Sequence, residues 1–184
     1  MSNKLFGINI SSKYSKTADL VTYLEDLHHE LSQLDQDSEN APQELNITAR
    51  YLLIPKITQS SSKEIRVLGA CCLADMLRIF APEAPFSDSD TLRVIDFLAN
   101  QIKGLQTVDI NSDLGKRIVY IMNSLSSVKS CVVPVIMSQN NVKGSDDTIQ
   151  SMLNAVISSI RPDHSQESKQ IFDFFSTSSS YMIF

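Results

Sequence analysis

The stretch from Lys63 to Phe86 constrains the fold more than any other, because it predicts a buried helix that ends at a rigid corner. Apolar side chains recur at helical spacing from Val67 to Phe80 with few polar breaks, which is typical of an inner helix packed on several sides. Ser62 is the expected N-cap, and Glu64 lies in the first turn, where a negative charge suits the helix dipole.

The residues after this helix predict a preformed turn, here called the proline corner (residues 81–86). The helix should end at Phe80 or the next residue, since a proline disfavours helix in the residue before it. The prolines fix φ and donate no hydrogen bond, so a single carboxylate is held between two rigid residues. On physical grounds alone, the simplest interpretation is a helix stop followed by a tight turn. The corner comprises Ala81, Pro82, Glu83, Ala84, Pro85 and Phe86.

Amphipathic stripes predict helices over most of the remaining chain. With the helix at 63–80 they make about seven, joined by short loops and without a strand pattern. Successive helices pair roughly every 35 to 50 residues, which favours an all-α, HEAT-like helical repeat solenoid over an ordinary helical bundle, the alternative. We expect residues 1–16 to form a flexible N-terminal arm and residues 17–184 a helical-repeat segment. The expected helices cover 17–36, 42–58 (kinked or ended at Pro55), 89–105, 113–130 and 147–161, with a short element at 131–137 and a last apolar face from Ile171.

Composition argues against several classes of protein. The chain has 184 residues, 42% of them apolar, which is enough for a sizeable core. Its 16 Lys and Arg residues are scattered and the net charge is -5, so a nucleic-acid surface is not expected. No apolar run approaches the ~20 residues of a membrane span. Three cysteines, two of them adjacent, do not make a disulfide framework, and we expect an intracellular, reducing compartment.

The cysteines and histidines do not predict a metal site. Cys71 and Cys72 point about 100° apart on a helix, so we expect them to be buried small residues and not joint ligands. His29 follows Glu25 by four residues, but one such pair supplies too few ligands, and this face with the neighbouring His28 is expected to be solvated.

A group of acids near the corner lacks the other parts of a catalytic site. No nucleophile, metal motif or oxyanion donor accompanies it. We therefore predict a binding module that is not an enzyme and carries no cofactor, in which Glu83 accepts hydrogen bonds from an arginine or a serine hydroxyl of a partner. The acids in question are Asp75, Glu83, Asp88 and Asp90.

The stretch LGACCLADMLRIFAPEAPF (residues 68–86) resembles a signature near the N-terminus of the precocious-dissociation-of-sisters family, the cohesin-associated HEAT-repeat regulators of sister-chromatid cohesion. LEDLHHELSQLDQD, ANQIKGLQ and YIMNSLSSVKS resemble the same family, so the resemblance covers most of residues 17–135. It implies a HEAT solenoid in the nucleus, associated with chromosomes. Family members are much longer, so we expect this chain to be the N-terminal portion of such a protein, in agreement with its apolar end at Phe184.

The resemblance also implies a role for the proline corner. The family's Ala-Pro-acid-Ala-Pro motif falls on residues 81–85, and Phe86 stands where tyrosine is frequent. The motif docks short segments of the wings-apart-like cohesin release factor and, in related systems, of the cohesin acetyltransferase, while contact with the kleisin subunit of cohesin is expected outside this segment. The alternatives are a transport or phosphatase scaffold, or a DNA-binding solenoid, against which the charge of -5 argues.

Overall fold

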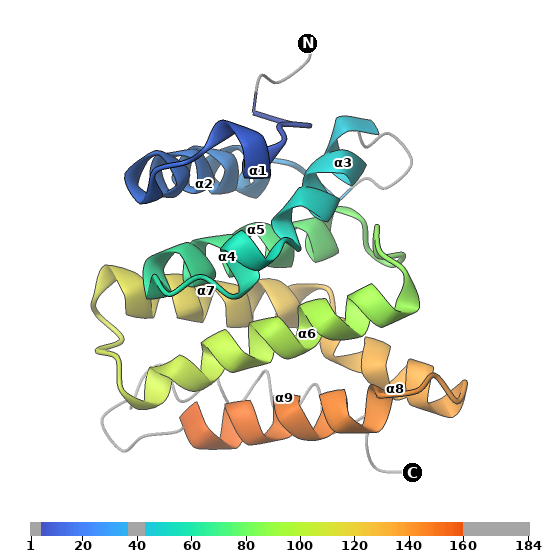
Figure 1. Cartoon of the computed structure of the whole chain (residues 1–184). Coiled ribbons are helices and arrows are strands. Elements are labelled where there is room, and N and C mark those ends of the chain that lie inside the picture. The colour runs from blue at the N-terminus through green and yellow to red at the C-terminus, as the bar shows by residue number, and fades with distance from the viewer. Residues whose placement is uncertain (1–4, 37–42, 160–184) are drawn as a thin grey trace. The chain divides into compact units, whose positions relative to one another are not determined.

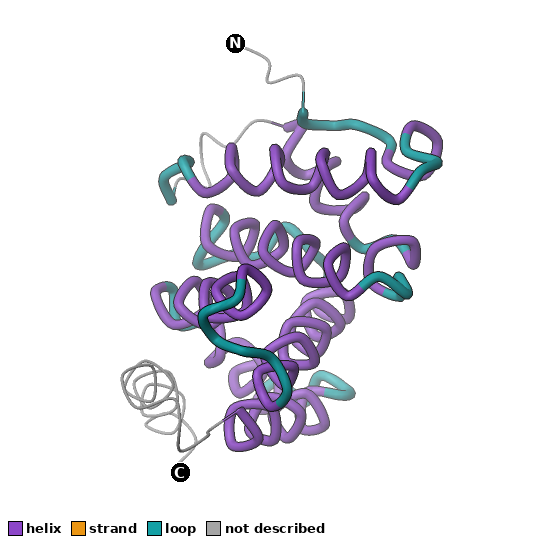
Figure 2. Tube along the Cα trace, turned by 90° about the vertical axis from the view of Figure 1, so that its left-hand side faces the viewer, coloured by secondary structure: helices purple, strands orange, loops and turns teal. Residues whose placement is uncertain are grey.

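The computed structural model describes residues 5–36 and 43–159, and this part of the chain is all-helical. It contains nine α-helices and two short 3₁₀ helices and no strand, and Figure 2 accordingly shows only helices and loops. The predicted all-α class is confirmed, and there are more helices than expected because one-turn helices escape periodicity. The chain divides into two compact units, Met1–Phe86 and Ser87–Phe184.

The first unit is built around α5, which packs on α2, α3 and α4. Thirteen of the 17 residues of α5 are buried, which confirms the predicted inner helix. The Ser62 hydroxyl accepts a hydrogen bond from the Ile65 amide (3.4 Å), so the predicted N-cap is also confirmed. The helices of this unit are α1 (Ile10–Lys13), α2 (Thr17–Ser32), α3 (Gln43–Leu52), α4 (Pro55–Thr58) and α5 (Lys63–Ile79) (Figure 1).

Within the predicted N-terminal arm, residues 10–13 form the one-turn helix α1. The side chain of Asn9 caps it by accepting hydrogen bonds from two amides, and Ile10 is fully buried. Tyr23 on α2 donates a hydrogen bond to the Leu5 carbonyl (3.0 Å) and stacks on Tyr14 with ring centroids 4.6 Å apart. This segment is therefore packed on α2 through specific contacts.

The helix predicted over residues 42–58 is divided into two helices near Pro55, in agreement with the predicted kink or end at this proline. The first part stops at Leu52, and Pro55 then begins α4. A proline is well tolerated at the first helical position because its missing N–H would have no partner there.

The second unit centres on α6, which packs against α7 and α9. Ser87 and Asp90 form the predicted start of α6: the Ser87 hydroxyl accepts from the Asp90 amide (3.3 Å) and donates to the Asp90 carboxylate (3.1 Å). The helix predicted over 113–130 ends earlier because Lys129 adopts a left-handed conformation (φ 54°). The elements are α6 (Asp88–Ile102), η1 (Lys103–Gln106), α7 (Asp113–Ser127), η2 (Ser130–Val132), α8 (Val133–Gln139) and α9 (Ser145–Ser159).

None of the helices in residues 5–36 and 43–159 combines the length and apolar character that a membrane crossing requires. The apolar face predicted from Ile171 lies outside the described residues.

Candidate functional site: the proline corner

The proline corner begins where α5 ends, as the sequence predicts. Phe80 caps α5 with its amide bonded to the Met76 carbonyl (3.1 Å), and its side chain is buried. The Ala81 amide still bonds to the Arg78 carbonyl (3.4 Å), and the following Ala81–Pro82 peptide bond is cis. The corner is thus joined directly to the most buried helix of the first unit.

The outer part of the corner faces solvent. Pro82 and Glu83 are exposed, whereas Ala84, Pro85 and Phe86 are half-buried. Among the residues that the structure describes, none forms an ion pair or a hydrogen bond with the Glu83 side chain. The carboxylate can therefore accept hydrogen bonds from an external donor, and the partial negative charge at the C-terminal end of α5 favours a cationic one.

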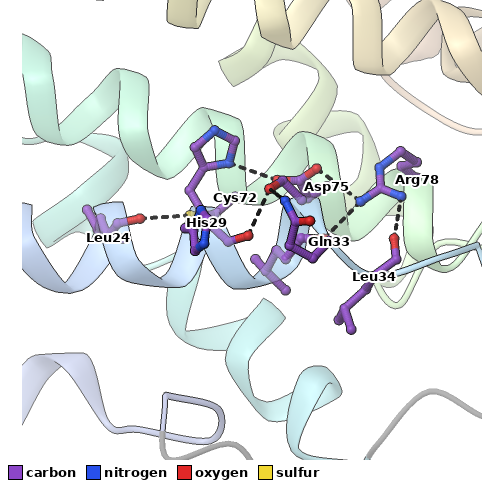
Figure 3. Close-up of polar contacts among 10 residues, drawn as sticks. Leu24, His29, Gln33, Leu34, Cys72, Asp75 and Arg78 are labelled. Atoms are coloured by element: carbon purple, nitrogen blue, oxygen red, sulfur yellow. Dashed lines mark hydrogen bonds and ion pairs between the residues drawn. The ribbon is translucent and has the colours of Figure 1, made fainter.

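Asp75 does not belong to an acid cluster at the corner, which corrects the grouping inferred from sequence. Its carboxylate is fully buried and faces α2, where Oδ2 lies 2.9 Å from His28 Nδ1. Its other oxygen lies 3.3 Å from Arg78 Nη2 (Figure 3). His28, predicted on a solvated face, is correspondingly only 19% exposed. The sequence offers no signal for this pair, because 47 positions separate its members.

Arg78 joins the end of α2 to the end of α5. It donates from Nη1 to the Leu34 carbonyl (2.7 Å) and from Nη2 to the Leu31 carbonyl (2.9 Å). The Leu31 carbonyl also accepts the Leu34 backbone amide (3.1 Å), so the guanidinium reinforces the turn in which α2 ends. We call Asp75, Arg78 and the two carbonyls the α2–α5 clamp.

A second connection runs from the residues after α2 to the corner itself. The Gln36 side chain donates from Nε2 to the Ala81 carbonyl (3.0 Å). Gln36 lies two residues beyond Leu34, whose carbonyl Arg78 holds. The first carbonyl of the corner and the clamp are therefore linked through a short segment, residues 34–36.

The two adjacent cysteines of α5 are buried, as predicted. The Cys72 thiol donates to the Leu24 carbonyl (3.6 Å), shown in Figure 3. Burial raises the pKa of Cys72 well above its usual value, and the neighbouring Cys71 and Asp75 add to this effect. Across the described part of the chain, no three His, Cys, Asp or Glu side chains come together in a way that could hold a metal ion.

The second unit contains an open cleft of about 430 Å³ between α6 and the start of α9. It carries cationic and acidic side chains together, and no pattern in the sequence points to it. Its lining comprises Ser89, Leu92, Arg93, Asp96, Lys143, Gly144, Asp147 and Thr148.

Amphipathic helices that stack on their neighbours are features of helical-repeat proteins. The family model described as sister chromatid cohesion protein PDS5 matches residues 18–177. This chain belongs to the PDS5 family of sister chromatid cohesion proteins, which confirms the resemblance carried by residues 68–86.

Individual relatives agree with this membership. PDS5 homolog A of Mus musculus is 30% identical over 174 residues, an alignment that covers 76% of this chain and 13% of that protein. PDS5 homolog A-B of Xenopus laevis is 41% identical over 98 residues, covering 53% of this chain and 7% of that protein. The chain thus spans only a small part of the length of its relatives.

The fold is also similar to that of a solved structure. A chain from a structure of a Pds5–Scc1 complex matches with a TM-score of 0.78 at 22% sequence identity, covering 98% of this chain and 26% of that one. The predicted HEAT-like helical fold is thereby confirmed.

Proposed function

We propose that this chain is part of a non-catalytic cohesin regulatory scaffold that controls sister-chromatid cohesion on chromosomes in the nucleus. The match to the PDS5 family model over residues 18–177 carries this proposal. The solved structure with a similar fold is a complex of Pds5 with Scc1, which supports cohesin as the partner assembly. Because this chain spans about 13% of a relative's length, the contact with the cohesin kleisin is proposed to lie outside it.

Within that scaffold, the proline corner docks short segments of the wings-apart-like release factor and of the cohesin acetyltransferase. The exposure of Pro82 and Glu83 supports this role, since both are reachable by a partner. A corner that is rigid before binding loses little conformational entropy when a segment docks on it. The Glu83 carboxylate then accepts hydrogen bonds from a cationic group of the segment, an interaction stronger than one between neutral groups.

The docking is tested by titrating a release-factor peptide into the wild-type chain and two corner variants, Glu83→Lys and Pro85→Ala. We expect Glu83→Lys to weaken binding by about 5- to 150-fold, since a carboxylate that pairs in the complex contributes on the order of 1–3 kcal/mol. Pro85→Ala weakens binding by a smaller factor, through lost rigidity.

Asp26→Lys supplies the matched control. Asp26 is exposed near the middle of α2, so the variant makes the same charge change away from the corner. If both corner variants bind like the wild type while remaining folded, the corner is not the docking site. Association with cohesin is a separate question, which co-precipitation of cohesin subunits with the full-length protein addresses.

A further inference from the structure

We propose that Gln36, fixed by the α2–α5 clamp, is a positioning residue for the proline corner. The inference rests on the proposed function, because it concerns the same docking surface. The corner does not act as an isolated turn, because its shape depends on a side chain contributed by the segment after α2.

The hydrogen bond from Gln36 lies at the entrance to the corner. Gln36 Nε2 donates to the carbonyl of Ala81, the residue that precedes Pro82. The orientation of this carbonyl defines the peptide plane from which the chain enters the proline ring. A donor at 3.0 Å on this carbonyl therefore favours one direction of the chain toward Glu83.

The α2–α5 clamp explains how an exposed glutamine can hold a defined position. Arg78 binds the carbonyls of Leu31 and Leu34, which fixes the backbone leading to Gln36. Arg78 is itself held by the carboxylate of Asp75, which is fully buried. The order of the corner's first carbonyl is thus set by contacts that begin in the core of the first unit.

One substitution separates positioning from simple electrostatics. Gln36→Glu adds a negative charge near the corner, which by charge alone would tighten the binding of a cationic segment. The same substitution replaces the amide donor with a carboxylate that faces the Ala81 carbonyl, so two acceptors oppose each other. If Gln36 positions the corner, binding weakens despite the favourable charge.

Gln33→Glu is the matched control. Gln33 is exposed at the C-cap of α2, three residues earlier, and its side-chain amide donates to the Ser32 hydroxyl, not to the corner. The two variants carry the same charge change at positions only three residues apart. A difference in peptide affinity between the two variants therefore measures the effect of the hydrogen bond from Gln36 to Ala81.

The experiment titrates the release-factor peptide into the full chain carrying each substitution. We expect Gln36→Glu to bind about threefold more weakly than the wild type, the scale of one partly exposed hydrogen bond, and Gln33→Glu to bind equally or more tightly. Both variants should unfold cooperatively with melting temperatures close to that of the wild type, which excludes a general loss of structure. If Gln36→Glu binds as well as the wild type while Glu83→Lys loses binding, the corner is the docking site but Gln36 does not position it.

A measurement without the peptide tests the positioning role of Gln36 even if no peptide docks at the corner. We expect the amide NMR resonances of Glu83 and Ala84 to shift in Gln36→Glu and not in Gln33→Glu. Unchanged corner resonances in Gln36→Glu would overturn the positioning role, whatever the outcome of the peptide titration.

Discussion

Replacing Arg78 by methionine removes the guanidinium from its contact with the buried Asp75 carboxylate and keeps most of the apolar stem. Three hydrogen bonds are lost, to the Asp75 carboxylate and to the carbonyls of Leu31 and Leu34. Removing one partner of a buried charge pair costs about 3–5 kcal/mol, because the other charge stays buried. The Arg78 side chain is 20% exposed and His28 still contacts Asp75, so we expect the lower end, about 3 kcal/mol of unfolding free energy.

The Asp90–Arg93 pair provides an internal control of the same spacing. Arg93 Nη1 lies 2.8 Å from Asp90 Oδ1, closer than the 3.3 Å between Arg78 Nη2 and Asp75 Oδ1. The Arg93 side chain, however, is 66% exposed. Exposed pairs contribute roughly 0–1 kcal/mol, so Arg93→Met should change the unfolding free energy by no more than about 0.5 kcal/mol. Urea unfolding followed by circular dichroism at 222 nm measures both variants. If Arg78→Met and Arg93→Met lower the unfolding free energy equally, burial does not determine how much such an ion pair contributes to stability.

Three further predictions concern packing and ionisation. Gly115→Ala should destabilise the chain by about 2 kcal/mol, because an added Cβ would lie 2.2 Å from the Asp109 carbonyl oxygen. This cost should exceed the gain from the higher helix propensity of alanine. Urea unfolding measures the difference, and an unchanged unfolding midpoint would contradict the close approach. Burial raises the pKa of Tyr23, so the unfolded chain releases this proton first and stability falls as the pH rises above about 10. Urea titrations at pH 8 to 11 should show a smaller decline for Tyr23→Phe, and an equal decline would exclude Tyr23 as its source. Cys72 should resist alkylation by iodoacetamide at pH 8 until urea unfolds the chain, since burial keeps its thiol protonated and inaccessible. Peptide mass mapping detects the alkylated residue, and labelling of Cys72 in the folded chain would contradict its burial.

The longer helices were predictable because each has a continuous apolar stripe, and α5, α6 and α7 also have a serine N-cap. Ser62 and Ser87 begin α5 and α6 as their positions indicate, since a hydroxyl that accepts a backbone amide is a local interaction. The one-turn helix α1 was not predictable, because it depends on burial of Ile10 against the rest of the unit. Local propensity does not stabilise so short a helix by itself.

Some features of the candidate site were likewise predictable from the sequence, and others were not. The end of α5 and the rigidity of residues 81–86 follow from two prolines, and the family signature is a continuous stretch of sequence. The roles of Asp75 and Gln36 do not follow, because their partners His28 and Ala81 are 47 and 45 positions away. Which residues meet across two helices depends on the register of their packing, and an apolar stripe alone does not determine that register.

A charge-reversal titration at the corner tests whether Glu83 faces a cation of the docked segment. The two chains are the wild type and Glu83→Lys, and the two peptides are the release-factor segment and the same segment with the cationic residue that is proposed to face Glu83 replaced by glutamate. We expect each reversal alone to weaken binding and the two reversed molecules together to recover part of the affinity, because opposite charges again face each other. If the double reversal binds no better than either single one, Glu83 does not contact a cation of the docked segment, and the proposed docking mode is wrong.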